Sequence, residues 1–221
     1  EIQEIIDQIE CAINPGEEDE EAIADMMAKS DRGEIESRVQ PGEIWQLGRH
    51  RIACADSTVE SNVKALLGDR FGHVGMVWAD PPYGIDLQPQ RQLTKAIAND
   101  TKETATTVWE NFIPIAYDLL RDNCCAYLCQ DWSEFDWTLP IIKSKFQIKT
   151  KIVWKKTQWG IGYYFRPQHE DILYCWKGKP DVPVSAISDV WEVARANAPI
   201  HSCEKPTDLL SIAFQHSSMP H

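Results

Sequence analysis

Residues 74–84, VGMVWADPPYG, decide the fold of this 221-residue chain. The first six form a short apolar run, which predicts a buried strand over 74–79. Asp80, two prolines and Tyr83 then follow at the carboxyl end of that strand, where open α/β sheets bind their ligands. Because prolines fix the backbone and lack amide donors, their carbonyls can face a substrate. The stretch predicts a binding edge at Asp80; the plainer alternative is an Asp-Pro turn that only ends a strand.

Segments with strand and helix patterns alternate along the rest of the chain. The periodicity of apolar residues predicts helices over 60–67, 107–120, 132–146 (interrupted by Pro140) and 207–216. Further strands are expected over 44–47, 50–55, 124–129, 148–154 and 171–176. The polar stretch 88–102 is expected to be a mobile loop beside the site, and 178–199 to be irregular. This alternation predicts an α/β fold with a largely parallel sheet.

Charge is distributed unevenly along the chain, whose formal net charge is −12. Residues 1–43 contain 14 acids and 3 bases, whereas residues 44–221 contain 20 acids and 19 bases. The acidity therefore belongs to an appendage over 1–41, which is expected to consist of helical segments and a linker. A compact domain is expected over 42–221.

A basic segment lies within this domain at 137–169, which has seven bases and no acid. A segment of this kind can meet the phosphates of a nucleic acid. The alternative is a solvated strand edge that lysines protect from pairing. The seven bases are Lys143, Lys145, Lys149, Lys151, Lys155, Lys156 and Arg166.

The cysteines and the hydropathy of the chain indicate the kind of cellular environment to expect for the protein. The seven cysteines are odd in number and lie mostly among apolar residues, which favours reduced thiols in the cytoplasm and small buried side chains over a zinc site. The cysteine pattern therefore predicts no metal site. No apolar run approaches the roughly 20 residues needed to span a bilayer, so no membrane span is expected. The chain starts at Glu1 with nothing like a signal peptide, which suggests a piece of a longer protein.

The chemistry of Asp80-Pro81-Pro82-Tyr83 suits an exocyclic amine. The lone pair of such an amine is conjugated with the ring, which makes it a poor nucleophile. The Asp80 carboxylate and the Pro81 carbonyl can accept its two N–H groups, localise the lone pair and stabilise the positive charge that develops on nitrogen. Tyr83 offers a ring on which a flipped-out base can stack, an interaction worth about 1–3 kcal/mol.

Together with three other segments, this motif resembles the amino-methyltransferases of DNA, in the chain order of phage-type and ParB-linked members, where the catalytic motif precedes the cofactor loop. The resemblance covers roughly 42–221 and implies base flipping and methylation of adenine N6 in DNA by S-adenosylmethionine, in the cytoplasm of a bacterium or of a phage host. The other segments are 42–57, 165–174 with Trp154-Lys155-Lys156, and 201–206.

Further site residues follow from the resemblance. It implies that Asp56 contacts the cofactor's adenine, although Asp56 also suits a helix cap. Asp80, His201 and Lys205 would lie against the cofactor, with Lys205 pairing with its carboxylate and Glu204 adding a competing charge. The resemblance also implies target-base and DNA contacts through the aromatic run and the bases around it. These residues are Tyr163, Tyr164, Phe165, Arg166, Lys149, Lys151, Lys155 and Lys156.

The family's glycine-rich cofactor loop is expected about ten residues beyond the helix at 207–216, and the chain ends at His221. The 221 residues alone are therefore expected to bind the cofactor poorly, unless the remainder of the protein or another chain supplies the loop. Three alternatives stay open: methylation of cytosine N4, whose enzymes usually have Ser in place of Asp80; a non-catalytic DNA-binding module; and methylation of RNA or of a protein glutamine, whose enzymes typically have Asn there.

Overall fold

The computed structural model describes residues 39–87, 97–160, 163–180, 187–196 and 203–217, together with Asp25 and Lys29. The chain divides into two compact units, and the larger one comprises Gly42–Arg195 and Lys205–His221. In the smaller unit, Asp25 and Lys29 are helical and form an ion pair at 2.5 Å. The rest of the predicted appendage, apart from residues 39–41, lies outside the described residues.

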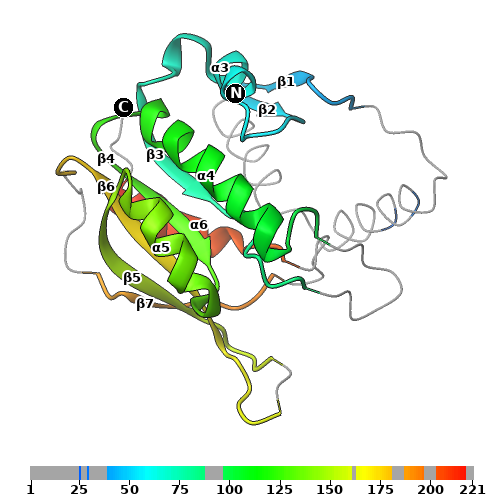
Figure 1. Ribbon diagram of the computed structural model, residues 1–221, viewed down its shortest axis with the longest axis vertical. Helices are drawn as coiled ribbons and strands as arrows, with labels where there is room; N and C mark the ends of the chain where they lie inside the picture. Colours follow the sequence, from blue (N-terminus) through cyan, green and yellow to red (C-terminus); the bar gives the residue numbers. More distant parts are fainter. Residues whose placement is uncertain are drawn as a thin grey trace, which may run out of the picture. The chain divides into compact units, whose positions relative to one another are not determined.

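A five-stranded sheet forms the centre of the larger unit (Figure 1). Its strand order is β3-β4-β6-β5-β7, with β3 parallel to β4 and β5 parallel to β7, whereas β6 is antiparallel to both of its neighbours. The strands are β3 (Val74–Ala79), β4 (Leu120–Gln130), β5 (Gln147–Lys155), β6 (His169–Lys177) and β7 (Val190–Glu192).

The α/β fold agrees with the sequence, but the expectation of a largely parallel sheet is not confirmed because the sheet is mixed. The reason is the connection between β5 and β6. Parallel neighbours need a long crossover, usually a helix, whereas residues 156–168 join β5 to β6 as a hairpin loop. The predicted strand at 171–176 is therefore present but runs in the opposite direction.

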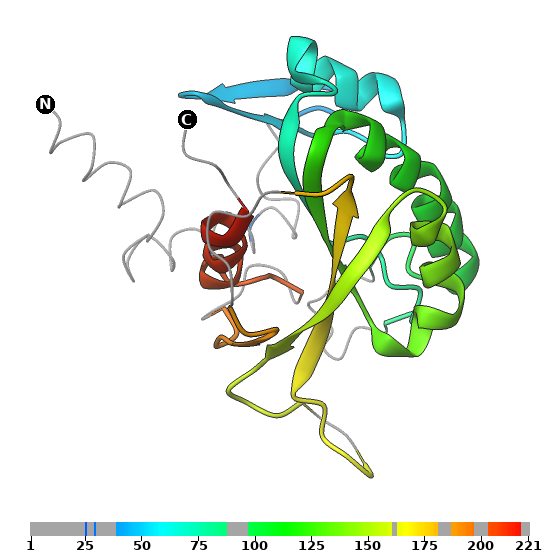
Figure 2. The same cartoon turned by 90° about the vertical axis from the view of Figure 1, so that its left-hand side faces the viewer.

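Helices cover both faces of the sheet, as Figure 2 shows. On one face, α4 (Lys102–Leu119) and α5 (Phe135–Lys143) bury Trp109, Ile113 and Ile142 against β4. On the other, α6 (Thr207–Ser217) buries Leu209 and Ala213. Full burial of one large apolar side chain contributes roughly 1.5–3 kcal/mol, so both faces of the strands are fixed by packing.

Tyr127 and the four cysteines of the sheet strands are part of these two cores. Cys124, Cys125, Cys129 and Cys175 are buried free thiols, in keeping with their interpretation as small buried side chains. Within the described parts of the chain, no group of three or more His, Cys, Asp or Glu side chains is arranged to hold a metal ion. No helix in those parts is both long and apolar enough to cross a membrane.

A small hairpin precedes the sheet along the chain. β1 (Ile44–Leu47) and β2 (His50–Ala53) pair antiparallel around Gly48, whose φ of +57° lies in the region that favours glycine. The Arg51 Nη1 donates to the Leu66 carbonyl at 3.1 Å, which ties β2 to α3 (Glu60–Leu67). These elements match the predicted ones, except that β2 ends two residues earlier.

Other element boundaries differ from prediction for local reasons. α4 begins five residues early because the Thr101 hydroxyl caps it by accepting the Thr104 N–H at 3.3 Å. α5, which follows a 3₁₀ turn at Trp132–Glu134, continues through Pro140 without the predicted interruption and ends at Lys143. The short strand β7 lies in the region expected to be irregular. Of the predicted mobile loop, 88–96 lies outside the described residues.

Candidate active site

The direction of the strands brings distant parts of the chain to one edge of the sheet. β3, β4 and β5 all run the same way, because β4 and β5 are each antiparallel to β6. Their carboxyl ends therefore share an edge with the amino end of β6. Asp80 follows β3, Lys156 follows β5, and Glu170 is the second residue of β6. The sheet edge predicted from 74–84 thus includes the root of the β5–β6 loop as well.

Buried contacts fix the backbone of the Asp80–Gly84 motif. The indole N–H of the fully buried Trp109 donates to the Pro82 carbonyl at 3.0 Å. Gly84 has a φ of +86°, and a Cβ there would lie 3.0 Å from Trp137 Cζ2, so both conformation and space require glycine. The motif is therefore held rigidly against α4 and α5.

Asp100 holds the chain just beyond the motif, and sequence reasoning missed it. Its carboxylate is 5% exposed and accepts the backbone N–H of Gly84 at 3.0 Å and of Leu87 at 2.9 Å. Its carbonyl accepts the Asp86 N–H at 2.7 Å. An acid directly before the cap residue Thr101 was the only available signal, and it lies in a polar stretch without periodicity.

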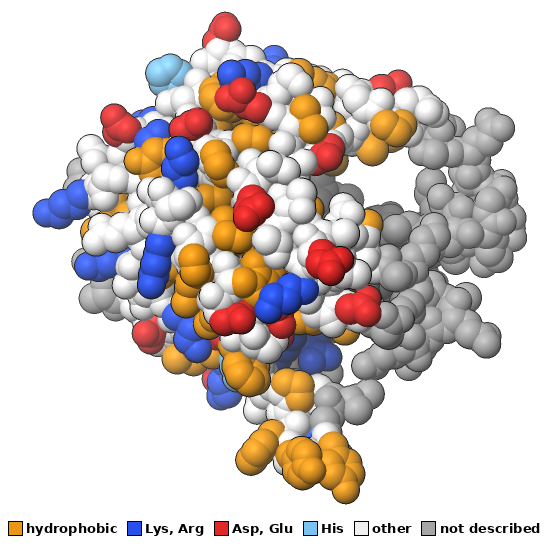
Figure 3. All heavy atoms as spheres, viewed as in Figure 1, with side chains coloured by type: hydrophobic (Ala, Val, Ile, Leu, Met, Phe, Trp, Pro, Cys, Tyr) orange, Lys and Arg blue, Asp and Glu red, His pale blue; other side chains and the backbone are white. Residues whose placement is uncertain are grey.

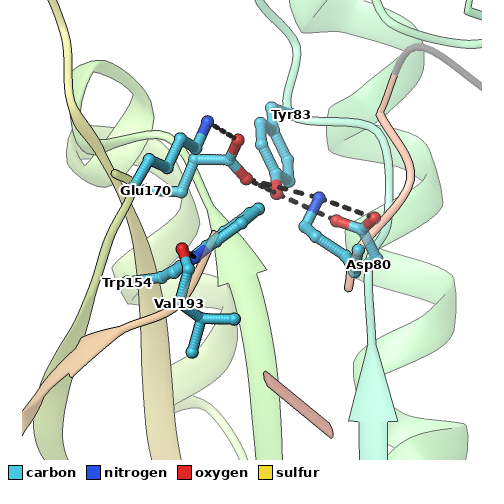
Figure 4. Close-up of polar contacts among 7 residues, drawn as sticks. Asp80, Tyr83, Trp154, Glu170 and Val193 are labelled. Atoms are coloured by element: carbon cyan, nitrogen blue, oxygen red, sulfur yellow. Dashed lines mark hydrogen bonds and ion pairs between the residues drawn. The ribbon is translucent and has the colours of Figure 1, made fainter. Parts of the chain in front are cut away.

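Two donors bind the Asp80 carboxylate, one at each oxygen (Figure 4). The Tyr83 hydroxyl donates to Oδ1 at 2.9 Å, and the Lys205 ammonium contacts Oδ2 at 2.9 Å. Lys205 also lies 5.5 Å from the centre of the Tyr83 ring. The structure therefore brings together Asp80, Tyr83 and Lys205, which sequence analysis had placed in two separate motifs.

Glu170 faces the same two donors from the other side. Its Oε2 is 3.3 Å from Lys205 Nζ and 3.4 Å from the Tyr83 hydroxyl, while its Oε1 accepts from Lys156. Asp80, Glu170, Lys156 and Lys205, here called the charge cluster, thus contain two carboxylates and two ammonium groups. The side chain of Lys205 is only 9% exposed, which makes its contacts with the carboxylates strong.

Burial and charge act in opposite directions on the pKa values of Glu170 and Lys205. Burial alone would raise the pKa of Glu170, but Lys205 and Lys156 outweigh it and hold that pKa below its ordinary value of 4.5. Burial would lower the pKa of Lys205, but Glu170 and Asp80 raise it above its ordinary value. Burial, together with the nearby Cys129, Asp80 and Glu170, raises the pKa of Tyr83, so its hydroxyl remains a donor.

Trp154 supports the charge cluster from β5. Its indole N–H donates to the Val193 carbonyl at 2.9 Å, and its ring lies 4.8 Å from Lys156 Nζ. Figure 4 shows the Trp154 ring below Glu170 and Tyr83 in this view, with Val193 lower still. The tryptophan is 2% exposed, so the side of the cluster that faces the core is dry.

The aromatic run is placed differently from the rest of the site. Tyr163, Tyr164 and Phe165 are 94%, 87% and 90% exposed, and they belong to the outer part of the β5–β6 loop, which projects beyond the sheet in Figure 1. In Figure 3, hydrophobic side chains protrude from the molecule at the same place. The two tyrosines contact each other edge to face, with ring centres 5.0 Å apart. The three rings therefore face solvent here.

Acidic side chains already pair with most of the lysines of β5 and its end. Lys151 lies 3.0 Å from the buried Asp171, Lys155 lies 2.9 Å from Glu192, and Lys156 contacts Glu170. Lys149 instead lies 4.7 Å from the centre of the Trp176 ring. The segment without acids in the sequence therefore receives its carboxylates from β6 and β7, which reduces its net positive charge.

Asp56 is exposed and caps the turn that leads into α3. Its Oδ1 accepts the Thr58 N–H at 2.8 Å and the Thr58 hydroxyl at 2.7 Å, and these hydrogen bonds lower the pKa of Asp56. These bonds hold the turn before α3, but the residue that precedes the helix is Val59, which makes no side-chain cap, so the helix-cap alternative for Asp56 is not confirmed. His201 lies outside the described residues.

The fold is similar to that of two solved structures of one protein, M1.HpyAVI. M1.HpyAVI, solved as its SAM complex, is 15% identical, with 75% of each chain covered and a TM-score of 0.50. A second structure of M1.HpyAVI has a TM-score of 0.51 at 15% identity, covering 76% of this chain and 75% of that one. The PvuII DNA methyltransferase (cytosine-N4-specific) is 10% identical, covers 66% of this chain and 63% of its own, and has a TM-score of 0.49.

The family assignment comes from the sequence. No curated protein sequence matches the chain. A family model described as DNA methylase, of the N6/N4 type, matches residues 74–186, slightly more than half of the chain, and its match begins at β3 and includes the Asp80 motif and Glu170. The chain therefore belongs to the N6/N4 family of DNA methylases.

Proposed function

We propose that the protein transfers a methyl group from S-adenosylmethionine to the N6 amine of an adenine that is flipped out of DNA. The observation that carries the proposal is Asp80, an aspartate at the carboxyl end of β3, followed by two prolines and Tyr83 on a rigid backbone. An aspartate can accept an amine N–H and also stabilise the positive charge that methyl transfer creates on nitrogen.

The contacts of the motif suggest how each residue acts. Trp109 occupies the Pro82 carbonyl, which makes the neighbouring Pro81 carbonyl the acceptor that we assign to the second N–H of the amine. Tyr83 is half-buried and hydrogen-bonded to Asp80, so its ring is held in one orientation against which the base can stack. Holding the amine in this way contributes through orientation as well as through charge.

S-adenosylmethionine is the methyl donor of this family, and it supplies a methyl group bound to a positively charged sulfur. The described residues fit it in two places. The exposed carboxylate of Asp56 can accept an N–H from the donor's adenine, and the negative charge of Asp80 favours a sulfonium cation nearby. Lys205 fits the donor's carboxylate less well, because Asp80 and Glu170 already hold its ammonium.

DNA would approach from the side of the β5–β6 loop. The loop begins and ends at the charge cluster, and its exposed aromatic rings are suited to stacking on bases. Arg166 is also exposed, directly after Phe165, and adds a cation that can contact phosphate. We propose that the loop binds DNA next to the flipped base.

The test is to incubate the full-length protein with unmethylated genomic DNA and labelled S-adenosylmethionine, then digest the DNA and separate its nucleosides by mass spectrometry. We expect the label in N6-methyladenine. Label found only in N4-methylcytosine would overturn the choice of base but keep the family. An unlabelled digest from a folded protein that binds DNA would instead favour a non-catalytic DNA-binding role.

A further inference from the structure

The charge of Lys205 creates a problem for the proposed chemistry, which rests on Asp80. The Lys205 ammonium is 2.9 Å from Asp80 Oδ2, and its side chain is nearly buried. An amine that gains a methyl group becomes positively charged beside the same carboxylate. A neighbouring ammonium repels this new charge, because like charges at close range disfavour each other in a partly buried site. Asp80 can stabilise the transition state fully only when Lys205 interacts with it less.

Glu170 provides the alternative partner for Lys205. Its Oε2 lies 3.3 Å from Lys205 Nζ, only 0.4 Å farther than the Asp80 oxygen at 2.9 Å, so a small movement transfers the ammonium from one carboxylate to the other. The same oxygen lies 3.4 Å from the Tyr83 hydroxyl, the second donor to Asp80. Both groups that occupy Asp80 thus have the same neighbouring acceptor.

Lys156 keeps this acceptor in place. It binds the other oxygen of Glu170, and its own backbone is fixed because its N–H donates to the Gln168 carbonyl at 2.8 Å. The Gln168 side chain donates back to the Lys156 carbonyl at 2.9 Å. Glu170 is therefore oriented by the root of the β5–β6 loop, with Oε2 directed at Lys205 and Tyr83.

From this geometry we infer that Glu170 is a positioning residue for methyl transfer: it takes over Lys205 from Asp80 when the target amine binds, which leaves the charge of Asp80 to the reacting nitrogen. No covalent bond changes in this step, and no proton has to move between the groups. The inference rests on the proposed function and holds for either an adenine or a cytosine amine. It gives Glu170 a role that acts through Lys205 and not through contact with the substrate.

The test uses the full-length protein, saturating S-adenosylmethionine and single-turnover methyl transfer to duplex DNA. Glu170→Gln keeps the shape of the side chain but removes its charge, so Lys205 stays with Asp80. We expect the rate to fall by about 10- to 100-fold, the range for losing a hydrogen bond to a charged group. Glu170→Asp should recover part of the rate. The matched control is Glu192→Gln, which breaks the exposed pair with Lys155 and should leave the rate unchanged.

A double variant separates this role from a merely structural one. Once Glu170 is neutral, Lys205 is the group that opposes the reaction, so Glu170→Gln with Lys205→Met should be faster than Glu170→Gln alone. If Glu170 only stabilised the site, removing a second member of the charge cluster would slow the reaction further.

Two results would overturn the inference: a normal rate for Glu170→Gln, or a double variant no faster than the single one. Failure of the proposed function is distinct from both, because the unsubstituted protein would then methylate no amine in DNA.

Discussion

The charge cluster and the tip of the β5–β6 loop belong to the same sheet edge but differ in almost every physical respect. In the cluster, Lys205 is 9% exposed and lies within 3.3 Å of two carboxylates. At the tip, Tyr163 is 94% exposed and has another loop tyrosine as its ring partner. The comparison suggests that the groups for chemistry are assembled in advance, whereas the groups for DNA reach their partner only in the complex.

The largest expected effect breaks the assembled side of this comparison. Asp80→Ala removes the acceptor of the amine. It should slow single-turnover methyl transfer by about 100- to 1,000-fold, roughly the cost of losing one preorganised electrostatic contact. DNA affinity should change by less than about twofold, because Asp80 attracts no phosphate. Asp118→Ala, on the exposed face of α4, is the matched control. A variant that retains most of its rate would place the active site elsewhere.

The next effect tests the loop. Replacing Tyr163, Tyr164 and Phe165 by alanine should raise the Kd for DNA by about 5- to 150-fold for each base that now stacks on a ring. Binding of S-adenosylmethionine, measured by calorimetry, should stay unchanged because the rings face solvent in the free protein. Phe214→Ala, which removes a half-exposed ring from α6, serves as control. Equal DNA affinity for the loop variant and the control would assign the exposed rings no part in DNA binding.

A smaller effect distinguishes the lysines of β5. The logarithm of the DNA-binding constant falls linearly with the logarithm of the salt concentration, and each lost phosphate contact should make this negative slope shallower by about one. Lys149→Gln should do so, whereas Lys151→Gln should change the slope little because Lys151 already pairs with the buried Asp171. Titrations of each variant with DNA at several salt concentrations measure the two slopes. If neutralising Lys149, Lys151, Lys155 and Lys156 together leaves the slope unchanged, these lysines only protect the sheet.

The smallest effect concerns stability and pH. The pKa of Glu170 is lowered in the folded protein, so its stabilisation is present above the ordinary value of 4.5 and is lost as pH falls through the folded value. The raised pKa of Lys205 preserves its contribution below 10.5 and removes it only as pH rises through the folded value. Urea unfolding should therefore show a plateau between these limits. Glu170→Gln should flatten the acid side, and an unchanged acid side would contradict the pairing.

Local signals in the sequence predicted elements well where composition and turn chemistry agree. The strand at 74–79 and the helix at 60–67 have the predicted bounds, because an apolar run ends at Asp-Pro and an apolar period ends at glycine. The direction of β6 was missed because loop 156–168 has no pattern that distinguishes a hairpin from a crossover. The start of α4 was missed because its cap, Thr101, follows a polar stretch.

The site shows the same division between local and long-range information. Asp80 and Tyr83 were predicted from one motif, and Lys205 from another 125 residues away. Sequence spacing cannot show that these residues touch, since the contact depends on how α6 packs against the sheet. It also could not show that Glu170 faces Lys205 and Tyr83, or that Asp171 and Glu192 pair with lysines of the basic segment.

The most direct measurement for the whole account is a structure of the full-length protein with a DNA duplex that contains its target base. We predict the exocyclic amine of a flipped adenine at hydrogen-bond distance, roughly 2.7–3.2 Å, from the Asp80 carboxylate, with the rings of Tyr163, Tyr164 and Phe165 packed against DNA. A target amine bound elsewhere while Asp80 stays fully paired with Lys205, or loop rings that remain in solvent, would contradict it.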